Sequence, residues 1–461
     1  MSETLSRKPG YFSRDPAFYK SVFRILILVA LQNVINYSVN MADNIMLGSF
    51  SQDALSGSTC VNQFFFVIQS FASSLSSGYA VLGSQYWGKR DRDSICRLAG
   101  VAIKACFLFG LLVFLLAALF PTAIVSFFTR DAGIVGEGAA YLSIVKYTYL
   151  PFCLSLIFME ILRSVETVHV AFYLSLSSLL INVGLNWLLI FGNAGFPAMG
   201  VRGAAVATLI ARGVELLVLI LYLLFRDKKL RLFSSDFLKP HTAFLKDYAR
   251  ITLPILLTGV AWSVATPVQS AILGRVSSDA IAANSIATTF YQYLKVITLA
   301  MSAASSVVIG KMVGKGDFEG AKQGAHSLEI MDLLIGFSLA LALFLLRKPL
   351  LSLYTLTPET LKLADDLIKL MCLVMIFMSY EVPVMYGSMK GAGDTKFSSF
   401  MNIFFVWTIS LPMAFLSAFV WHWGIVAIVA CIQSDQAIKC IPAFLRFHCS
   451  HDKWIHKLTR D

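Results

Sequence analysis

The sequence predicts an all-α polytopic membrane protein with twelve transmembrane helices in two pseudo-symmetric six-helix lobes. Composition and an internal repeat both point to this fold. Of the 461 residues, 57% are hydrophobic and only 14% are charged, whereas about a quarter of the residues in soluble domains are charged. The chain therefore has too little polar surface for a soluble globule, and we expect it to fold within a lipid bilayer.

Apolar segments of roughly 20 residues recur along the whole chain, and a helix of that length crosses a ~30 Å hydrocarbon core. The predicted spans are 22–47, 55–83, 98–127, 139–162, 170–191, 202–225, 249–274, 280–309, 327–347, 363–388, 397–419 and 421–445. The first apolar segment is too long for a signal-peptide core and is not followed by a clear cleavage site. We therefore expect it to remain as the first helix.

The positive charges are distributed by side of the membrane. With the N-terminus placed inside, most of the 38 Lys and Arg residues lie in the two tails and in the connections on the inner side. This is the positive-inside pattern, which predicts that both termini are cytoplasmic. The net charge of +11 then reflects topology, and no nucleic-acid partner is expected. The eight cysteines show no paired spacing, so no disulfide framework is predicted.

An internal repeat appears when the sequence is shifted by 226 residues, which aligns 43–91 with the second half without a gap. The matched pairs include Leu47 with Leu273, Gly48 with Gly274, Phe64 with Phe290, Gly88 with Gly314 and Asp91 with Asp317. Because six spans per half is an even number, the halves should have the same orientation in the membrane. The predicted parts are a cytoplasmic tail (1–21), an N-lobe (22–225), a cytoplasmic linker (226–248), a C-lobe (249–445) and a second cytoplasmic tail (446–461).

Two equivalent connections, 88–91 and 314–317, each begin with Gly and Lys. We expect them to be cytoplasmic turns in which Gly permits a positive φ. Neither matches the phosphate-binding loop GxxxxGK[ST], and that motif occurs nowhere in the chain. Direct use of ATP is therefore not expected.

Polar residues form stripes along several predicted helices, at helical steps of three and four residues. In the first helix the stripe consists of Asn33, Asn36, Asn40 and Asp43. Interhelical hydrogen bonding, worth about 0.6 kcal/mol per contact, explains any single Asn or Ser, but repeated stripes favour a water-filled cavity. The residues expected to line a substrate cavity are Asn36, Asn40, Gln69, Trp262, Gln269, Gln292, Lys295 and Tyr380.

Ionisable residues inside the membrane are the strongest candidates for function, because burying a charge there costs about 3 kcal/mol or more. Asp43 is the first candidate for exchanging H⁺ or Na⁺, with pairing to a neighbour as the structural alternative. Glu381 is the second, either as an ion or substrate site or as a member of a structural pair. Lys295 is the candidate for its partner, or alternatively for balancing charge when a site empties. Asn182 and Asn186, one turn apart, offer oxygens for a hard cation or for orienting Asp43, although interhelical bonding explains them equally well.

No metal centre is predicted beyond Na⁺ at Asp43. His448, His451 and His456 are expected in a solvated cytoplasmic tail, without a supporting Cys or His spacing. A membrane enzyme is a rival interpretation, but the chain contains no HExxH and no GxSxG motif. We therefore expect a protein that is not an enzyme and that uses no cofactor apart from a coupling ion, H⁺ or Na⁺.

Five short motifs resemble those of the multidrug and toxic compound extrusion (MATE) family. They are MADNIMLG (41–48), QYWGK (85–89), MGVRGAA (199–205), AANSI (282–286) and KGAGDT (390–395). The resemblance implies twelve helices in a V of two lobes, and a drug antiport cycle driven by H⁺ or Na⁺. It also implies that Asp43 and Asn182 match coupling residues of the family. Asn186 and Trp262 depart from it, since some members have an aspartate and others a glutamate at these places.

The expected function is export of organic, cationic or amphipathic drugs or toxins in exchange for H⁺ or Na⁺ by alternating access. The alternative is a flippase or exporter of a lipid-linked or amphipathic metabolite. Such flippases have more cationic cavities, and Lys295 is the one clear mid-span cation that the sequence suggests. The expected partners are small organic molecules and the lipid bilayer, with the protein acting as a monomer in the plasma membrane.

Overall fold

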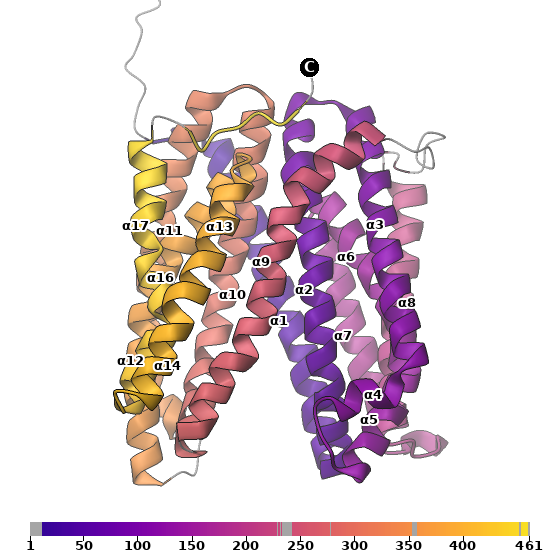
Figure 1. The fold of residues 1–461 in the computed structure, drawn as a ribbon. Helices are drawn as coiled ribbons and strands as arrows, with labels where there is room; N and C mark the ends of the chain where they lie inside the picture. The colour runs from indigo at the N-terminus through magenta and orange to yellow at the C-terminus, as the bar shows by residue number, and fades with distance from the viewer. Residues whose placement is uncertain are drawn as a thin grey trace, which may run out of the picture. The chain divides into compact units, whose positions relative to one another are not determined.

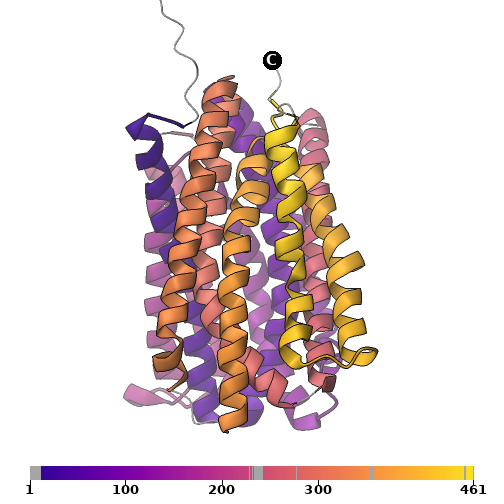
Figure 2. The same cartoon turned by 90° about the vertical axis from the view of Figure 1, so that its left-hand side faces the viewer.

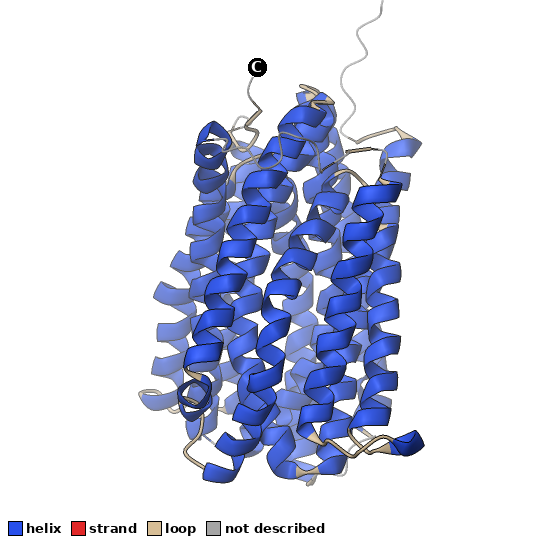
Figure 3. Ribbon diagram, turned by 90° about the vertical axis from the view of Figure 1, so that its right-hand side faces the viewer, coloured by secondary structure: helices blue, strands red, loops and turns tan. Residues whose placement is uncertain are grey.

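The computed structural model describes residues 12–227, 229–230, 232, 242–276, 278–352, 357–450 and 453–459, without the side chains of 278–282. Across these residues the chain is helical and contains no named strand, only an isolated bridge between Gly393 and Ile455 (Figure 3). The predicted all-α class is therefore confirmed.

The first half of the chain forms the helices labelled in Figure 1 from α1 to α8. They are α1 (Pro16–Phe50), α2 (Gln52–Lys89), α3 (Arg92–Leu119), α4 (Pro121–Ser126), α5 (Ala132–Val145), η1 (Lys146–Thr148), α6 (Tyr149–Ser164), α7 (His169–Leu189), η2 (Asn193–Gly195), α8 (Val201–Leu221) and η3 (Tyr222–Arg226). The second half forms α9 (Thr242–Val276), α10 (Ser278–Gly314), α11 (Phe318–Leu351), α12 (Pro358–Val382), η4 (Pro383–Met389), α13 (Thr395–Phe405), η5 (Val406–Ser410), α14 (Leu411–Phe419), α15 (Ile425–Ile432), α16 (Ser434–Ile438), α17 (Cys440–Phe444) and η6 (Leu445–Cys449).

Among the described residues, 11 helices are long and apolar enough to cross a membrane. The pair Ile425–Ile432 and Ser434–Cys449, bent by 47°, gives 12 spans if it counts as one. The bend frees backbone carbonyls, which hydrocarbon cannot satisfy. Ser410 Oγ donates to the carbonyl of Ile432 at 2.6 Å, and Ser434 Oγ donates to that of Cys431 at 2.7 Å. These hydroxyls allow the last span to bend, and the predicted twelve helices are confirmed.

The chain divides into two compact units. Unit 1 contains residues 1–30, 84–90 and 261–461, and unit 2 contains residues 31–83 and 91–260. Three helices, α1, α2 and α9, therefore contribute residues to both units. Figure 2 faces α11 and α12 of unit 1, which pack on each other, together with the C-terminal segments in yellow.

The internal repeat extends to the way in which helices begin. Asp91 Oδ1 accepts a hydrogen bond from the amide of Ser94 at 3.0 Å and caps α3. Its repeat partner Asp317 caps α11, where Oδ1 accepts from the amide of Gly320 at 2.9 Å. Such a cap is worth about 1 kcal/mol, so each half uses the same residue to start its third long helix.

The positive φ predicted for a glycine of the two equivalent turns is confirmed at Gly316 (80°) in the second turn. In the first turn the positive φ occurs at Arg90 (62°), and neither Gly88 nor Gly314 has one. Within unit 1, a Cβ atom on Gly88 would lie 2.0 Å from the carbonyl oxygen of Lys311. A Cβ atom on Gly314 would lie 1.9 Å from that of Gln85. The two glycines thus permit direct contact of the α2 and α10 backbones, a common use of Gly between membrane helices.

Replacing Gly314 by alanine should therefore destabilise the protein. The added methyl group would meet a backbone carbonyl that cannot rotate away, and overpacking of this kind costs about 1–3 kcal/mol. We expect a lower thermal unfolding midpoint for purified Gly314→Ala in detergent. The control is Gly136→Ala in α5, where no heavy atom lies within 4 Å of the new Cβ. Equal midpoints for both variants would contradict the close crossing.

Candidate functional site

Asp43 lies in unit 2, in the second half of α1, where it contacts α7. Asn186 donates through Nδ2 to Asp43 Oδ1. The same nitrogen lies 3.3 Å from Asn182 Oδ1, and Asn182 Nδ2 donates in turn to Thr208 Oγ1 at 3.3 Å. A continuous chain of hydrogen bonds therefore joins α1, α7 and α8 at the level of Asp43.

The local sequence explains how α7 and α8 present these groups. Asn182 and Asn186 are four residues apart, so they lie on one face of α7, and both are buried. Small residues allow α8 to approach this helix, since a Cβ atom on Gly203 would lie 2.5 Å from the carbonyl oxygen of Leu189. Thr208 Oγ1 donates to the carbonyl of Ala204 at 3.0 Å, which leaves its lone pairs to accept from Asn182.

A small cavity adjoins Asp43 within unit 2. Its volume, measured as the space open to the centres of water molecules, is about 50 Å³. One water needs roughly 10–15 Å³ of such space, whereas drug-sized ligands occupy pockets of roughly 300 Å³ or more. The lining combines polar groups with aromatic walls and includes Asn40, Asp43, Asn62, Phe65, Tyr141, Tyr149, Phe152, Asn182, Thr208 and Arg212. The cavity therefore suits a proton, a few waters or a small cation.

The electrostatics of the cavity depend on Asp43 and Arg212. Arg212 lines the cavity, but its Nη1 also pairs with the buried Glu215 at 2.8 Å, and its guanidinium lies 5.3 Å from the ring centroid of Phe152. Among the described residues, Asn186 Oδ1 is buried and has no hydrogen-bond partner. An acceptor oxygen is thus available beside a carboxylate, which is the chemistry that an incoming cation or proton donor requires.

The residues predicted to line a substrate cavity fall into different surroundings. In unit 2, Asn36, Asn40 and Gln69 are exposed, and Asn40 also lines the cavity beside Asp43. In unit 1, Gln292 is exposed and Gln269 is half-buried. Also in unit 1, the ammonium of Lys295 lies 5.0 Å from the ring centroid of Trp262, so these two predicted residues meet as a cation–π pair.

Glu381 is completely buried in unit 1 and is paired with a residue that sequence analysis missed. Lys439 Nζ lies 3.3 Å from Glu381 Oε1 and 2.9 Å from Asp435 Oδ2. Lys295, the candidate partner, acts on Glu381 only as a nearby charge, whereas Lys439 forms the ion pair. The expectation of a single clear mid-span cation was wrong. The available signal was the spacing of Asp435 and Lys439, four residues apart in the last apolar segment. Two carboxylates thus share one ammonium.

Replacing Lys439 by methionine should strongly destabilise unit 1. Glu381 and Asp435 would remain buried without a counter-charge, and breaking a buried pair in this way costs about 3–5 kcal/mol. We expect a large fall in the unfolding midpoint of Lys439→Met, partly restored when Glu381 is also changed to glutamine. The exposed Lys396 gives the control variant, Lys396→Met, which should unfold like the wild type. A wild-type midpoint for Lys439→Met would contradict the ion-pair assignment.

A parallel repeat of membrane-spanning helices that encloses polar groups and an intramembrane carboxylate is the architecture of a membrane transporter. Comparison with known proteins identifies the family of transporters to which the chain belongs. A family model described as MatE matches residues 29–188 and 254–416. This chain belongs to the MATE family, whose members are transporters and not enzymes.

Several relatives match over most of the chain. The probable multidrug resistance protein NorM of Thermotoga maritima is 25% identical over 401 residues, which cover 87% of this chain and 86% of that protein. The probable multidrug resistance protein YoeA of Bacillus subtilis is 24% identical over 405 residues, which cover 87% of each chain. The uncharacterized transporter YisQ of Bacillus subtilis is 22% identical and covers 98% of both chains.

Solved structures show the same fold. An outward-facing multidrug resistance MATE family transporter matches with a TM-score of 0.85 and 18% identity, over 95% of this chain and 97% of that one. A transporter from Pyrococcus furiosus, whose structure was described as having a binding pocket of reverse polarity, matches with a TM-score of 0.84 and 18% identity, over 93% of this chain and 95% of that one. The protein is thus a multi-pass membrane transporter with the MATE fold.

Proposed function

We propose that this transporter exports organic, cationic or amphipathic small molecules across the plasma membrane in exchange for H⁺, by alternating access. The observation that carries the proposal is the Asp43 carboxylate, which adjoins a small polar cavity and is bonded to the buried Asn186. Two relatives named as probable multidrug resistance proteins support drug-like substrates. The protein acts as a monomer with both termini in the cytoplasm.

The hydrogen bonding around Asp43 supports H⁺ over Na⁺ as the coupling ion. Asn186 presents its Nδ2 donor to the carboxylate, and Asn182 Oδ1 already receives a hydrogen bond. A sodium ion would need several oxygen ligands in place of that donor, whereas a proton needs only one carboxylate oxygen. Asp43 is also the only carboxylate among the residues that line this cavity.

Protonation of Asp43 would change the contact between α1 and α7. The neutral carboxyl group carries an O–H donor. The adjacent acceptor is Oδ1 of Asn186, which has no hydrogen-bond partner within the described part of the chain. Each protonation state thus favours a different arrangement of the same pair of side chains. We propose that α1 shifts when the side chains of Asp43 and Asn186 rearrange. This shift would link protonation of Asp43 to the accessibility of the substrate site.

The alternative of a lipid-linked metabolite flippase is less well supported. Its expected mark is a cationic cavity, and the newly found Lys439 does not provide one because Glu381 and Asp435 neutralise it. Lys295 in turn lies over the ring of Trp262. The described mid-span cations therefore do not combine into a site for polyanionic lipid headgroups.

Asp43→Asn should abolish gradient-driven export. The amide cannot ionise, so the variant cannot bind and release the coupling proton. We expect efflux of ethidium from cells that express the variant to fall to the level of cells without the transporter, at equal protein abundance in the membrane. The control is Asp53→Asn, an exposed carboxylate at the start of α2, which should export like the wild type. Full efflux by Asp43→Asn would refute the role of Asp43.

The coupling ion can be identified in proteoliposomes that contain the purified protein and ethidium. An imposed pH gradient should drive ethidium against the direction of proton flow, and a Na⁺ gradient at equal pH should not. Transport driven by Na⁺ alone would overturn the assignment of H⁺ and leave antiport itself intact. Transport that responds to neither gradient would overturn antiport.

A further inference from the structure

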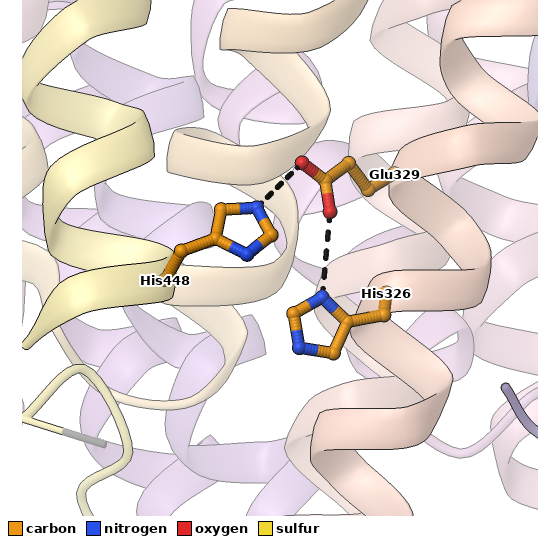
Figure 4. Close-up of side chains that lie close together, drawn as sticks. All are labelled: His326, Glu329 and His448. Carbon is orange, nitrogen blue, oxygen red and sulfur yellow. Dashed lines mark hydrogen bonds and ion pairs between the residues drawn. The ribbon is translucent and has the colours of Figure 1, made fainter. Parts of the chain in front are cut away.

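A second group of polar residues lies in unit 1 and takes no part in the function proposed above. His326 and Glu329 are on α11, and His448 is on η6, the last turn of the C-terminal helix (Figure 4). Glu329 Oε1 lies 2.9 Å from His448 Nε2, and Oε2 lies 3.4 Å from His326 Nδ1. The expectation that His448 belongs to a solvated tail was wrong, because the helix continues to Cys449 and brings the imidazole against α11.

The geometry of the three side chains matches a metal site. One ligand atom from each residue lies within 4.8 Å of the others. Around Zn²⁺, bonds of about 2.0–2.2 Å place tetrahedral ligand atoms about 3.3–3.5 Å apart. Glu329 Oε2 already lies at this distance from His326 Nδ1, and Oε1 lies closer to His448 Nε2. His326 and Glu329 are three residues apart on one face of α11, so small side-chain rotations are enough to bring the ligands together.

The ring positions are held by neighbouring aromatic groups. The imidazoles of His326 and His448 stack on each other, with centroids 5.0 Å apart and an interplanar angle of 27°. Phe447 packs edge-on against His326 at 5.0 Å, and Phe444 lies 4.5 Å from His448. The three ligand side chains are only 10–18% exposed. Preorganised and partly desolvated ligands bind a metal with less loss of side-chain freedom.

Further oxygen atoms surround the carboxylate. The hydroxyl of Tyr380 lies near Glu329, and the Tyr380 side chain also lines a cavity of about 440 Å³ between α11, α12 and the C-terminal helix. Asp332 follows Glu329 by three residues on α11 and is 1% exposed. Its Oδ1 atom is buried and has no hydrogen-bond partner among the described residues.

We infer that His326, Glu329 and His448 form a binding site for a divalent transition-metal ion of the Zn²⁺ type, which joins α11 to the C-terminal helix. Two imidazoles and one carboxylate suit Zn²⁺, Co²⁺ or Ni²⁺, whereas Na⁺, Mg²⁺ and Ca²⁺ prefer oxygen ligands alone. The site is therefore chemically different from a coupling-ion site at Asp43. A bound ion would stabilise the last span, because it would fix the end of a helix pair that is bent by 47°.

The test is metal binding by the purified full-length protein, measured without any transport assay. After removal of metals with EDTA, we expect isothermal titration calorimetry to show one Zn²⁺ per chain. Co²⁺ should give visible absorption bands of a low-symmetry, nitrogen-containing site, and Zn²⁺ should remove them. The thermal unfolding midpoint should rise with Zn²⁺, because the ion binds only the folded arrangement. Addition of Na⁺ should not compete.

Two ligand variants and one control complete the experiment. Glu329→Gln and His448→Asn should each weaken Zn²⁺ binding by at least about 100-fold, since loss of even an outer partner of a metal ligand costs about 10–100-fold. His422→Asn, an exposed histidine with φ of 50°, should bind like the wild type. If a variant proves unstable, the loss of Zn²⁺ stabilisation in the other variant remains decisive. Absence of saturable binding, or equal affinity in all three variants, would overturn the site.

Discussion

The hydrocarbon core of a bilayer provides no hydrogen-bond partner, and this one constraint explains where polar groups occur in the protein. Each polar side chain inside a span must contact another part of the protein or water. The bend of the last span is possible because hydroxyls of Ser410 and Ser434 satisfy carbonyls near it. The buried Gln85 obeys the same constraint, since its amide nitrogen donates to the carbonyls of Gly391 and His456.

The contacts of Gln85 show how distant motifs form one structural element in unit 1. Its side-chain oxygen accepts from the amide of Leu458 at 2.8 Å, while its own backbone lies against Gly314. Within the same unit, a Cβ atom on Gly391 would lie 2.3 Å from the carbonyl oxygen of Ser306. Two of the motifs that suggested the family, 85–89 and 390–395, therefore pack around the end of α10. The small residue Gly391 allows the close backbone contact. The side-chain amide of Gln85 forms hydrogen bonds with backbone groups at this contact.

Much of the fold was predictable because hydrophobic runs, charge asymmetry and the repeat of 226 residues are all properties of the linear chain. The proximity of Asn186 to Asp43 followed less directly, from helical spacing and from the shortage of partners in a membrane. The pairing of Glu381 with Lys439 depends on how α12 packs on the bent last span. His448 was misjudged because the last helix extends four residues beyond its predicted end at 445. Such errors arise where contact depends on tertiary packing and not on periodicity.

The half-buried Asp43 and the buried pair Glu381 and Asp435 differ in whether a fixed positive charge compensates their carboxylates. In unit 1, the ammonium of Lys439 lies within ion-pair distance of both Glu381 and Asp435. In unit 2, Asp43 is bonded to a neutral amide, and the nearby Arg212 is paired with Glu215. A carboxylate held by a lysine gains little from binding a proton, whereas one that faces a neutral amide gains more from neutralisation. The repeat thus supplies two similar scaffolds, and their different charge partners support the proposal that Asp43, and not Glu381, exchanges the coupling ion.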